Sequence, residues 1–170
     1  MTTTLLPATE IMIVADSWNA EPDAEAVIFR AIAAAAAHVD ADTADAELAI
    51  MLTDDSGIRT LNQNWRGIDK PTNVLSFPAL QPPADAEELD DMPRMLGDIA
   101  IAYETTRREA DEQEKTFENH LSHLAVHGFL HLVGYDHEKD GDAETMEDLE
   151  REILAHLGIT DPYADQDRVN

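Results

Sequence analysis

Runs of apolar residues along the chain predict four buried strands. They lie at about residues 11–15, 47–52, 74–77 and 97–102, and each is short and bounded by polar or turn residues, as is typical of strands in a core. Between and after them, capping residues and helical spacing of apolar positions predict about five helices. They are expected at 21–39, at 57–67, at 103–115, at 116–133, and from the acidic stretch 138–142 to Gly158.

The order of these segments predicts the fold class. Strands cluster early and helices late, which favours an α+β fold in which a small mixed four-stranded sheet packs against about five helices. The first two strands, joined by a helix, are expected to be parallel, and the last two antiparallel. In the second helix, Ile58, Leu61 and Trp65 are expected to lie on one face.

The length of the chain favours one domain. Its 170 residues fit a single domain over 1–170. Residues 1–8 and 160–170 are expected to be flexible ends. Segment 79–94 is proline-rich and acidic without a period, which predicts a mobile loop.

The amino-acid composition limits the kinds of metal site and binding partner. There is no cysteine, so disulfides and thiolate zinc sites are excluded and histidine is the remaining strong nitrogen ligand. No secretion signal and no membrane-spanning segment are visible, which predicts a cytoplasmic protein without a membrane partner. The net charge is −25, and taken alone it argues against a polyanionic partner, because phosphate contacts need local positive charge.

Three histidines in the fourth helix and the turn after it form the main candidate site. His127 and His131 are four residues apart, so both imidazoles can point to one spot from a helix. Gly134 can adopt the left-handed conformation that ends a helix and so bring His137 back to the same spot. Three histidine ligands with an open fourth position are typical of a catalytic zinc ion.

Other assignments of the histidines stay open at this point. His123 and His127 also have i, i+4 spacing, and His123 can instead orient a ligand or be a hydrogen-bonded core residue, as can His120. Asp136 can be a fourth ligand or a carboxylate that orients His137. The histidines could also be core residues satisfied by the backbone, or hold a metal that serves only structure.

The zinc peptidase motif offers a comparison. That motif is His-Glu-x-x-His, with the glutamate as general base, whereas Gly128 follows His127 here. A peptidase is therefore disfavoured.

Residues 127–137, His-Gly-Phe-Leu-His-Leu-Val-Gly-Tyr-Asp-His, resemble the signature of the YbeY family of bacterial endoribonucleases. Leu61-Asn62, Trp65-Arg66-Gly67 and the run from Asp69 to Pro78 resemble its second motif, and the resemblance covers about residues 45–163. It implies that His127, His131 and His137 bind zinc and that Arg66 lines the cleft. It also implies cleavage of single-stranded RNA, maturation of the 3′ end of 16S rRNA, ribosome quality control and a ribosomal partner.

These residues suggest a mechanism. Zinc on three imidazoles would acidify water toward a pKa of ~7, and Arg66 would offer a charged planar fork to phosphate oxygens. By spacing alone, Arg66 could equally be a surface arginine at a helix end. The alternative functions are a non-enzymatic, metal-containing ribosome-assembly factor and a metallo-hydrolase of peptide or small phosphoester substrates.

Overall fold

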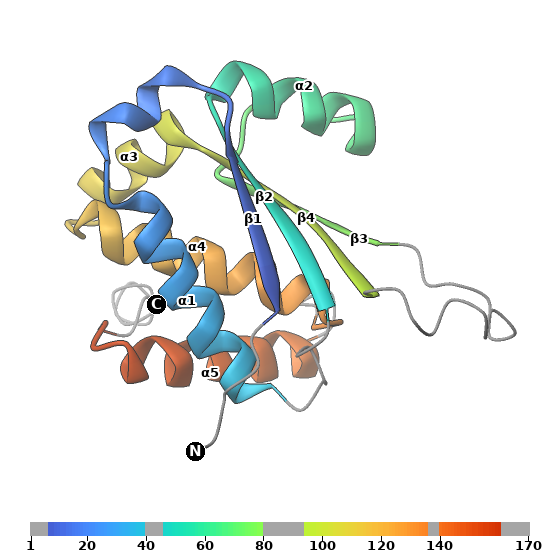
Figure 1. Ribbon diagram of the computed structural model, residues 1–170, viewed down its shortest axis with the longest axis vertical. Coiled ribbons are helices and arrows are strands. Elements are labelled where there is room, and N and C mark those ends of the chain that lie inside the picture. The colour runs from blue at the N-terminus through green and yellow to red at the C-terminus, as the bar shows by residue number, and fades with distance from the viewer. Residues whose placement is uncertain (1–6, 40–45, 80–93, 136–139, 161–170) are drawn as a thin grey trace, which may run out of the picture.

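A mixed four-stranded sheet lies between two groups of helices in the computed structural model, which describes residues 7–39, 46–79, 94–135 and 140–160 (Figure 1). The strands are β1 (Ala8–Ile13), β2 (Ala46–Thr53), β3 (Val74–Pro78) and β4 (Arg94–Ala102). Their order is β1-β2-β4-β3, so β3 is an edge strand. β1 and β2 are parallel, as are β2 and β4, whereas β3 and β4 are antiparallel. The predicted pairing directions and the α+β class are confirmed.

Five α-helices surround the sheet: α1 (Ala24–His38), α2 (Asp55–Arg66), α3 (Tyr103–Glu112), α4 (Phe117–Leu132) and α5 (Asp140–His156). A 3-10 helix, η1 (Asp16–Ala20), was not predicted. It buries Trp18, whose Nε1 donates to the carbonyl of Thr53 at 2.7 Å, and this long-range bond ends the first strand at Ile13 instead of Ala15. A single buried aromatic therefore sets the path between β1 and α1.

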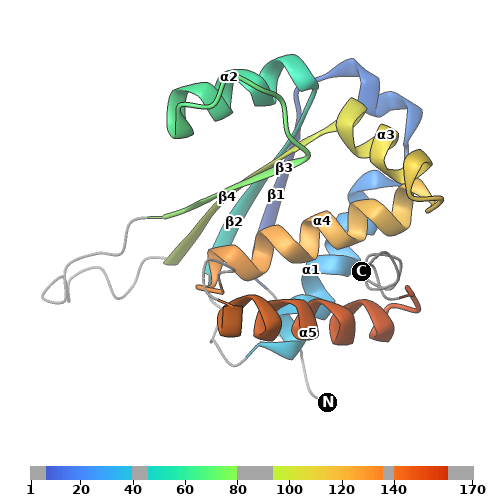
Figure 2. The same cartoon turned by 180° about the vertical axis from the view of Figure 1, so that it is seen from behind.

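The two faces of the sheet bury different helices. α1 and α4 pack with β2 and β4 on one face, and α5 packs against α1 and α4, as seen from both sides in Figures 1 and 2. On the other face Ile58 of α2 packs with Leu75 and Ala100. Leu61 packs against the same cluster as Ile58. Trp65, one turn further along α2, is 72 % exposed, and its ring centroid lies 5.9 Å from that of Phe77 of β3.

Both ends of α2 are capped. The carboxylate of Asp54 accepts from the Gly57 amide at 2.8 Å, which satisfies one of the free N–H groups of the first turn. At the other end Gly67 has φ +71°, and the amides of Gly67 and Ile68 donate back to Gln63 and Asn62. This glycine-dependent ending fixes where Arg66, the last residue of α2, leaves the helix.

α4 is the helix on which the predicted site depends, and it is buried along most of its length. The Thr116 hydroxyl caps it by accepting from the Asn119 amide at 3.1 Å. At its end Gly134 has φ +106°, and the amide of Tyr135 donates to the Leu130 carbonyl at 2.9 Å. The predicted helix-ending role of Gly134 is confirmed.

Some predictions fall outside the described residues. The expected flexible ends 1–8 and 160–170 and the expected loop 79–94 lie there except for their innermost residues. Within the described residues, no helix is long and apolar enough to cross a membrane.

Candidate active site

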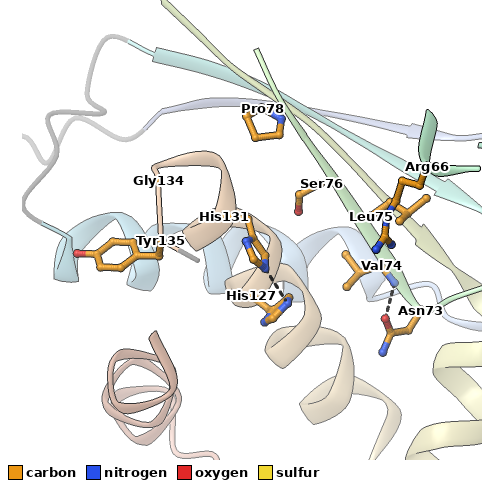
Figure 3. A pocket seen from close by; sticks show the side chains of 10 residues that line it. All are labelled: Arg66, Asn73, Val74, Leu75, Ser76, Pro78, His127, His131, Gly134 and Tyr135. Atoms are coloured by element: carbon orange, nitrogen blue, oxygen red, sulfur yellow. Dashed lines mark hydrogen bonds between the residues drawn. The ribbon is translucent and has the colours of Figure 1, made fainter. Parts of the chain in front are cut away.

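A cavity of about 650 Å³ opens between α4, the edge strand β3 and the end of α2 (Figure 3). It brings together segments some sixty residues apart in the chain. Its polar lining consists of Arg66, Asn73, Ser76, His127 and His131. Val74, Leu75, Pro78, Gly134 and Tyr135 complete the walls. Two of the three predicted zinc ligands and the predicted phosphate ligand therefore line one cavity.

His127 and His131 present their Nε2 atoms to each other. These atoms are 3.1 Å apart, and the ring centroids are 4.6 Å apart. Two nitrogens at the usual zinc–nitrogen distance in a tetrahedral site would be about 3.3 Å apart. The rings of His123 and His127, the rival pair with the same spacing, have centroids 6.3 Å apart. The geometry of the first pair thus fits a metal ion better.

The third predicted ligand, His137, lies outside the described residues, as does Asp136. Within the described parts of the chain, no group of three or more His, Cys, Asp or Glu side chains could hold a metal ion. The described residues contribute two of the three predicted metal ligands, the imidazoles of His127 and His131 on α4. The turn at Gly134 and Tyr135, beside the cavity, is where the chain leaves α4 toward residue 137.

A buried carboxylate binds the other ring nitrogen of His127, Nδ1. Glu150 of α5 is 1 % exposed, and its two oxygens contact different imidazoles on α4. His123 Nε2 donates to Oε2 at 2.6 Å, and His127 Nδ1 donates to Oε1 at 3.1 Å. His123 thus directs its Nε2 to Glu150.

The charge of Glu150 follows from these bonds. Burial by itself would raise the pKa of this carboxyl, but the hydrogen bonds from His123 and His127 outweigh it and lower the pKa to about 2. Burial also lowers the pKa of His123, although Glu150 opposes that shift. At neutral pH a carboxylate therefore lies between two imidazoles.

A second histidine–carboxylate pair, His120 and Glu109, is linked to the cavity through Asn73. His120 Nε2 and Asn73 Nδ2 both donate to Glu109 Oε1 at 2.9 Å. Burial raises the pKa of Glu109, but the hydrogen bonds from His120 and Asn73 give a net lowering. Asn73 also accepts from the Val74 amide through Oδ1. This network fixes the amide side chain of Asn73 at the cavity wall.

Arg66 is placed differently from most arginines of the described chain. Arg59, Arg107, Arg108 and Arg151 all form ion pairs with carboxylates. Arg66 is exposed, lines the cavity, and makes no side-chain hydrogen bond or ion pair with any described residue. Its guanidinium is available to an anion in the cavity, as expected for a phosphate ligand.

Gly128 faces the sheet rather than the cavity. A Cβ atom there would lie 3.0 Å from Ile99 Cγ2 and 3.1 Å from Ser76 Oγ, and the Ser76 hydroxyl donates to the Gly128 carbonyl at 3.2 Å. The glycine thus permits close packing of α4 on β3 and β4. A glutamate in this position would enter that contact instead of reaching a metal-bound water, which argues further against a peptidase.

Glu150 was missed by the sequence-based prediction. It follows Met146 by four residues and precedes Ile153 by three, so it lies on the apolar stripe of its helix. An acidic residue within such a stripe is a signal of a buried, paired charge, and this signal could have identified it.

The chain is similar in sequence to proteins of one named family. The family model described as "Endoribonuclease YbeY" matches residues 13–158. A protein named Endoribonuclease YbeY from Rhodopseudomonas palustris (strain BisB18) is 75 % identical over 170 residues, covering 100 % of both chains. One of the same name from Bradyrhizobium diazoefficiens is 74 % identical over 161 residues, covering 95 % of this chain and 87 % of that one.

Among solved structures, the solution structure of TM1509 from Thermotoga maritima is similar, with a TM-score of 0.54 and 25 % identity. The match covers 88 % of this chain and 91 % of that one. Sequence, fold and family model thus agree over most of the chain. The chain belongs to the YbeY family of endoribonucleases and is a hydrolase of the nuclease class.

Proposed function

We propose that this protein is a zinc-dependent endoribonuclease that cleaves single-stranded RNA in the maturation of the 16S rRNA 3′ end. His127, His131 and His137 would bind zinc, and Arg66 would bind the phosphate. The observation that carries this proposal is the approach of His127 Nε2 to His131 Nε2 at 3.1 Å in the cavity that Arg66 also lines. Family membership supports the choice of RNA as substrate.

The chemistry can be assigned to the residues of the cavity. His127, His131 and His137 would hold the zinc ion, which would supply a Lewis acid and lower the pKa of a bound water toward ~7. Arg66 would donate two hydrogen bonds to phosphate oxygens and stabilise the charge that builds up on them in the transition state. Asn73 donates one N–H of its side-chain amide to Glu109. The remaining N–H of Asn73 would bind and orient the RNA strand.

The size of the cavity supports a single-stranded substrate. Its volume of about 650 Å³ lies in the range of cavities that enclose small ligands, about 300–1,000 Å³. An unpaired nucleotide can enter such a space between α4 and β3, whereas a base-paired one is held in its duplex. We therefore expect preference for unpaired RNA.

The acidic surface suggests how RNA is delivered. With a net charge of −25 and four arginines already paired with carboxylates, the protein attracts free RNA weakly. A basic ribosomal protein would be attracted to the same surface. We infer that the enzyme acts on ribosome-bound RNA in the cytoplasm, where it would also serve ribosome quality control.

The test is a cleavage assay with matched charge changes. Arg66→Glu should keep its zinc but lose RNA cleavage by about 100-fold or more, the loss expected when one transition-state charge contact is removed. Arg30→Glu makes the same charge change at an exposed position of α1, and its RNA cleavage should stay close to that of wild type. Casein and duplex RNA serve as substrates that should not be cleaved. Full activity of Arg66→Glu would contradict the assigned role.

A further inference from the structure

We propose that Glu150 is a positioning residue for the metal site, whose carboxylate, anchored by His123, holds His127 in the tautomer that leaves Nε2 without hydrogen. The inference rests on the proposed function, since it takes His127 Nε2 as a zinc ligand. It concerns α5, a helix that does not line the cavity, and it gives a task to His123, which the mechanism does not use.

The donors and acceptors available determine the direction of the two hydrogen bonds to Glu150. A carboxylate only accepts hydrogen bonds, and both oxygens of Glu150 lie within hydrogen-bond distance of a ring nitrogen, at 2.6 and 3.1 Å. The nitrogen of each imidazole that faces it must therefore carry hydrogen: Nε2 of His123 and Nδ1 of His127. In a neutral His127, hydrogen on Nδ1 leaves a lone pair on Nε2, the atom that faces His131.

The carboxylate itself is held from two sides. His123 binds Oε2 at 2.6 Å, the shorter of the two contacts, so the group cannot rotate away from His127 without breaking that bond. The Glu150 side chain is itself only 1 % exposed. Water therefore has little access to its oxygens and competes poorly with the two imidazoles for them.

This arrangement links metal affinity to the docking of α5. The imidazoles belong to α4, whereas the carboxylate comes from α5, 23 residues after His127. When α5 is docked, Glu150 orients His127; when α5 is displaced, His123 and His127 lose the carboxylate that binds them both. Carboxylates that orient a metal-ligating histidine in this way typically contribute about 10- to 100-fold in metal affinity.

The first test needs no variant. Imidazole ¹⁵N chemical shifts of zinc-free wild-type protein at neutral pH report which nitrogen of each histidine carries hydrogen. We expect His127 with hydrogen on Nδ1 and His123 with hydrogen on Nε2. A His127 ring with hydrogen on Nε2 alone would overturn the proposal, whatever the protein does with zinc.

The second test compares two variants that remove the same charge from α5. In Glu150→Gln the amide can accept from one ring but must donate to the other, so a single His127 tautomer is no longer imposed. Zinc affinity, measured by competition with a chromophoric chelator, should fall about 10- to 100-fold. Glu152→Gln, at an exposed position of the same helix, should bind zinc like wild type.

The outcomes separate this inference from the proposed function. Equal zinc affinity of wild type and Glu150→Gln would refute the positioning role and leave the zinc enzyme intact. Wild-type protein that binds no zinc would refute the proposed function and, with it, the metal part of this inference. If Glu150→Gln does not fold, as circular dichroism would show, the ¹⁵N measurement on wild-type protein still decides the tautomer.

Discussion

The Nε2 atoms of His127 and His131 lie 3.1 Å apart, one turn from each other on α4, and both imidazoles line the cavity that Arg66 also lines. Two imidazole nitrogens approach so closely either through a hydrogen bond between them or through a shared cation. Because Glu150 accepts the hydrogen on His127 Nδ1, Nε2 of His127 can accept from His131 or bind a metal. Under the proposed function, the lone pair on His127 Nε2 is the one that would bind zinc.

Removal of one ligand should therefore remove the metal. Purified wild-type protein should carry about one zinc per chain, as three-histidine sites do, and His131→Ala should carry almost none after dialysis, measured by elemental analysis. His156→Ala, which changes an exposed histidine at the end of α5, is the control and should keep its zinc. Equal zinc content in wild type and His131→Ala would place the metal elsewhere.

Much of the fold was predictable because local signals and tertiary packing agree. The helix end at Gly134 and the strand directions were expected and are observed. The 3-10 helix η1 was not predicted, for a physical reason. The bond from Trp18 to Thr53 joins residues 35 apart, and no local sequence pattern indicates it. Trp65 was expected on the same face of α2 as Ile58, and its ring lies beside that of Phe77 of β3.

The candidate site was predictable only in part. The spacing of His127 and His131 on one helix predicted their approach, and the second motif predicted Arg66. Spacing could not decide between His123 and His131 as the partner of His127, because both lie one turn away. The choice depends on Glu150, which comes from another helix, and contacts between helices are set by packing rather than by local sequence.

Gly128→Ala should destabilise the protein although alanine favours helices. The new methyl group would lie 3.0–3.1 Å from Ile99 and Ser76, and overpacking of about 1–3 kcal/mol exceeds the gain in helix propensity of about 1 kcal/mol. We expect a net loss of about 1 kcal/mol in urea denaturation. In an Ile99→Val background, which removes Cδ1 but keeps Cγ2, Gly128→Ala should cost less. The same cost in both backgrounds would mean that the contact with Cδ1 does not contribute.

Glu109 should make stability depend on pH in acid. Its pKa is lowered in the folded state, where burial opposes and the hydrogen bonds from His120 and Asn73 favour ionisation. A lowered carboxyl pKa stabilises the folded state above the unfolded value of 4.5, and this contribution is lost as pH falls through the lower, folded value. At pH 7 we expect Glu109→Gln to cost about 1 kcal/mol, since the group is partly exposed.

The measurement is the difference in unfolding free energy between wild type and Glu109→Gln, at pH 7 and at steps below pH 4.5. Taking the difference cancels the titration of the many other carboxylates. Glu112→Gln, exposed on the same helix, should differ little from wild type at any of these pH values. A difference for Glu109→Gln that stays constant or grows on acidification would contradict the assigned contacts.

RNA binding by the isolated protein should depend only weakly on salt. Each phosphate neutralised on a single strand contributes about −0.7 to the slope of log affinity against log salt, and Arg66 is the one arginine among the described cavity-lining residues. The net charge of −25 adds a repulsion that salt screens, which opposes that slope. We expect a slope no steeper than about −1 for the wild-type protein. Arg66→Gln should make the slope less negative by about 0.7.

The slope can be measured by fluorescence anisotropy with zinc-free protein and short unstructured RNA. The control variant Arg30→Gln should leave the slope unchanged. A steep slope that does not change in Arg66→Gln would show that RNA binds to another surface.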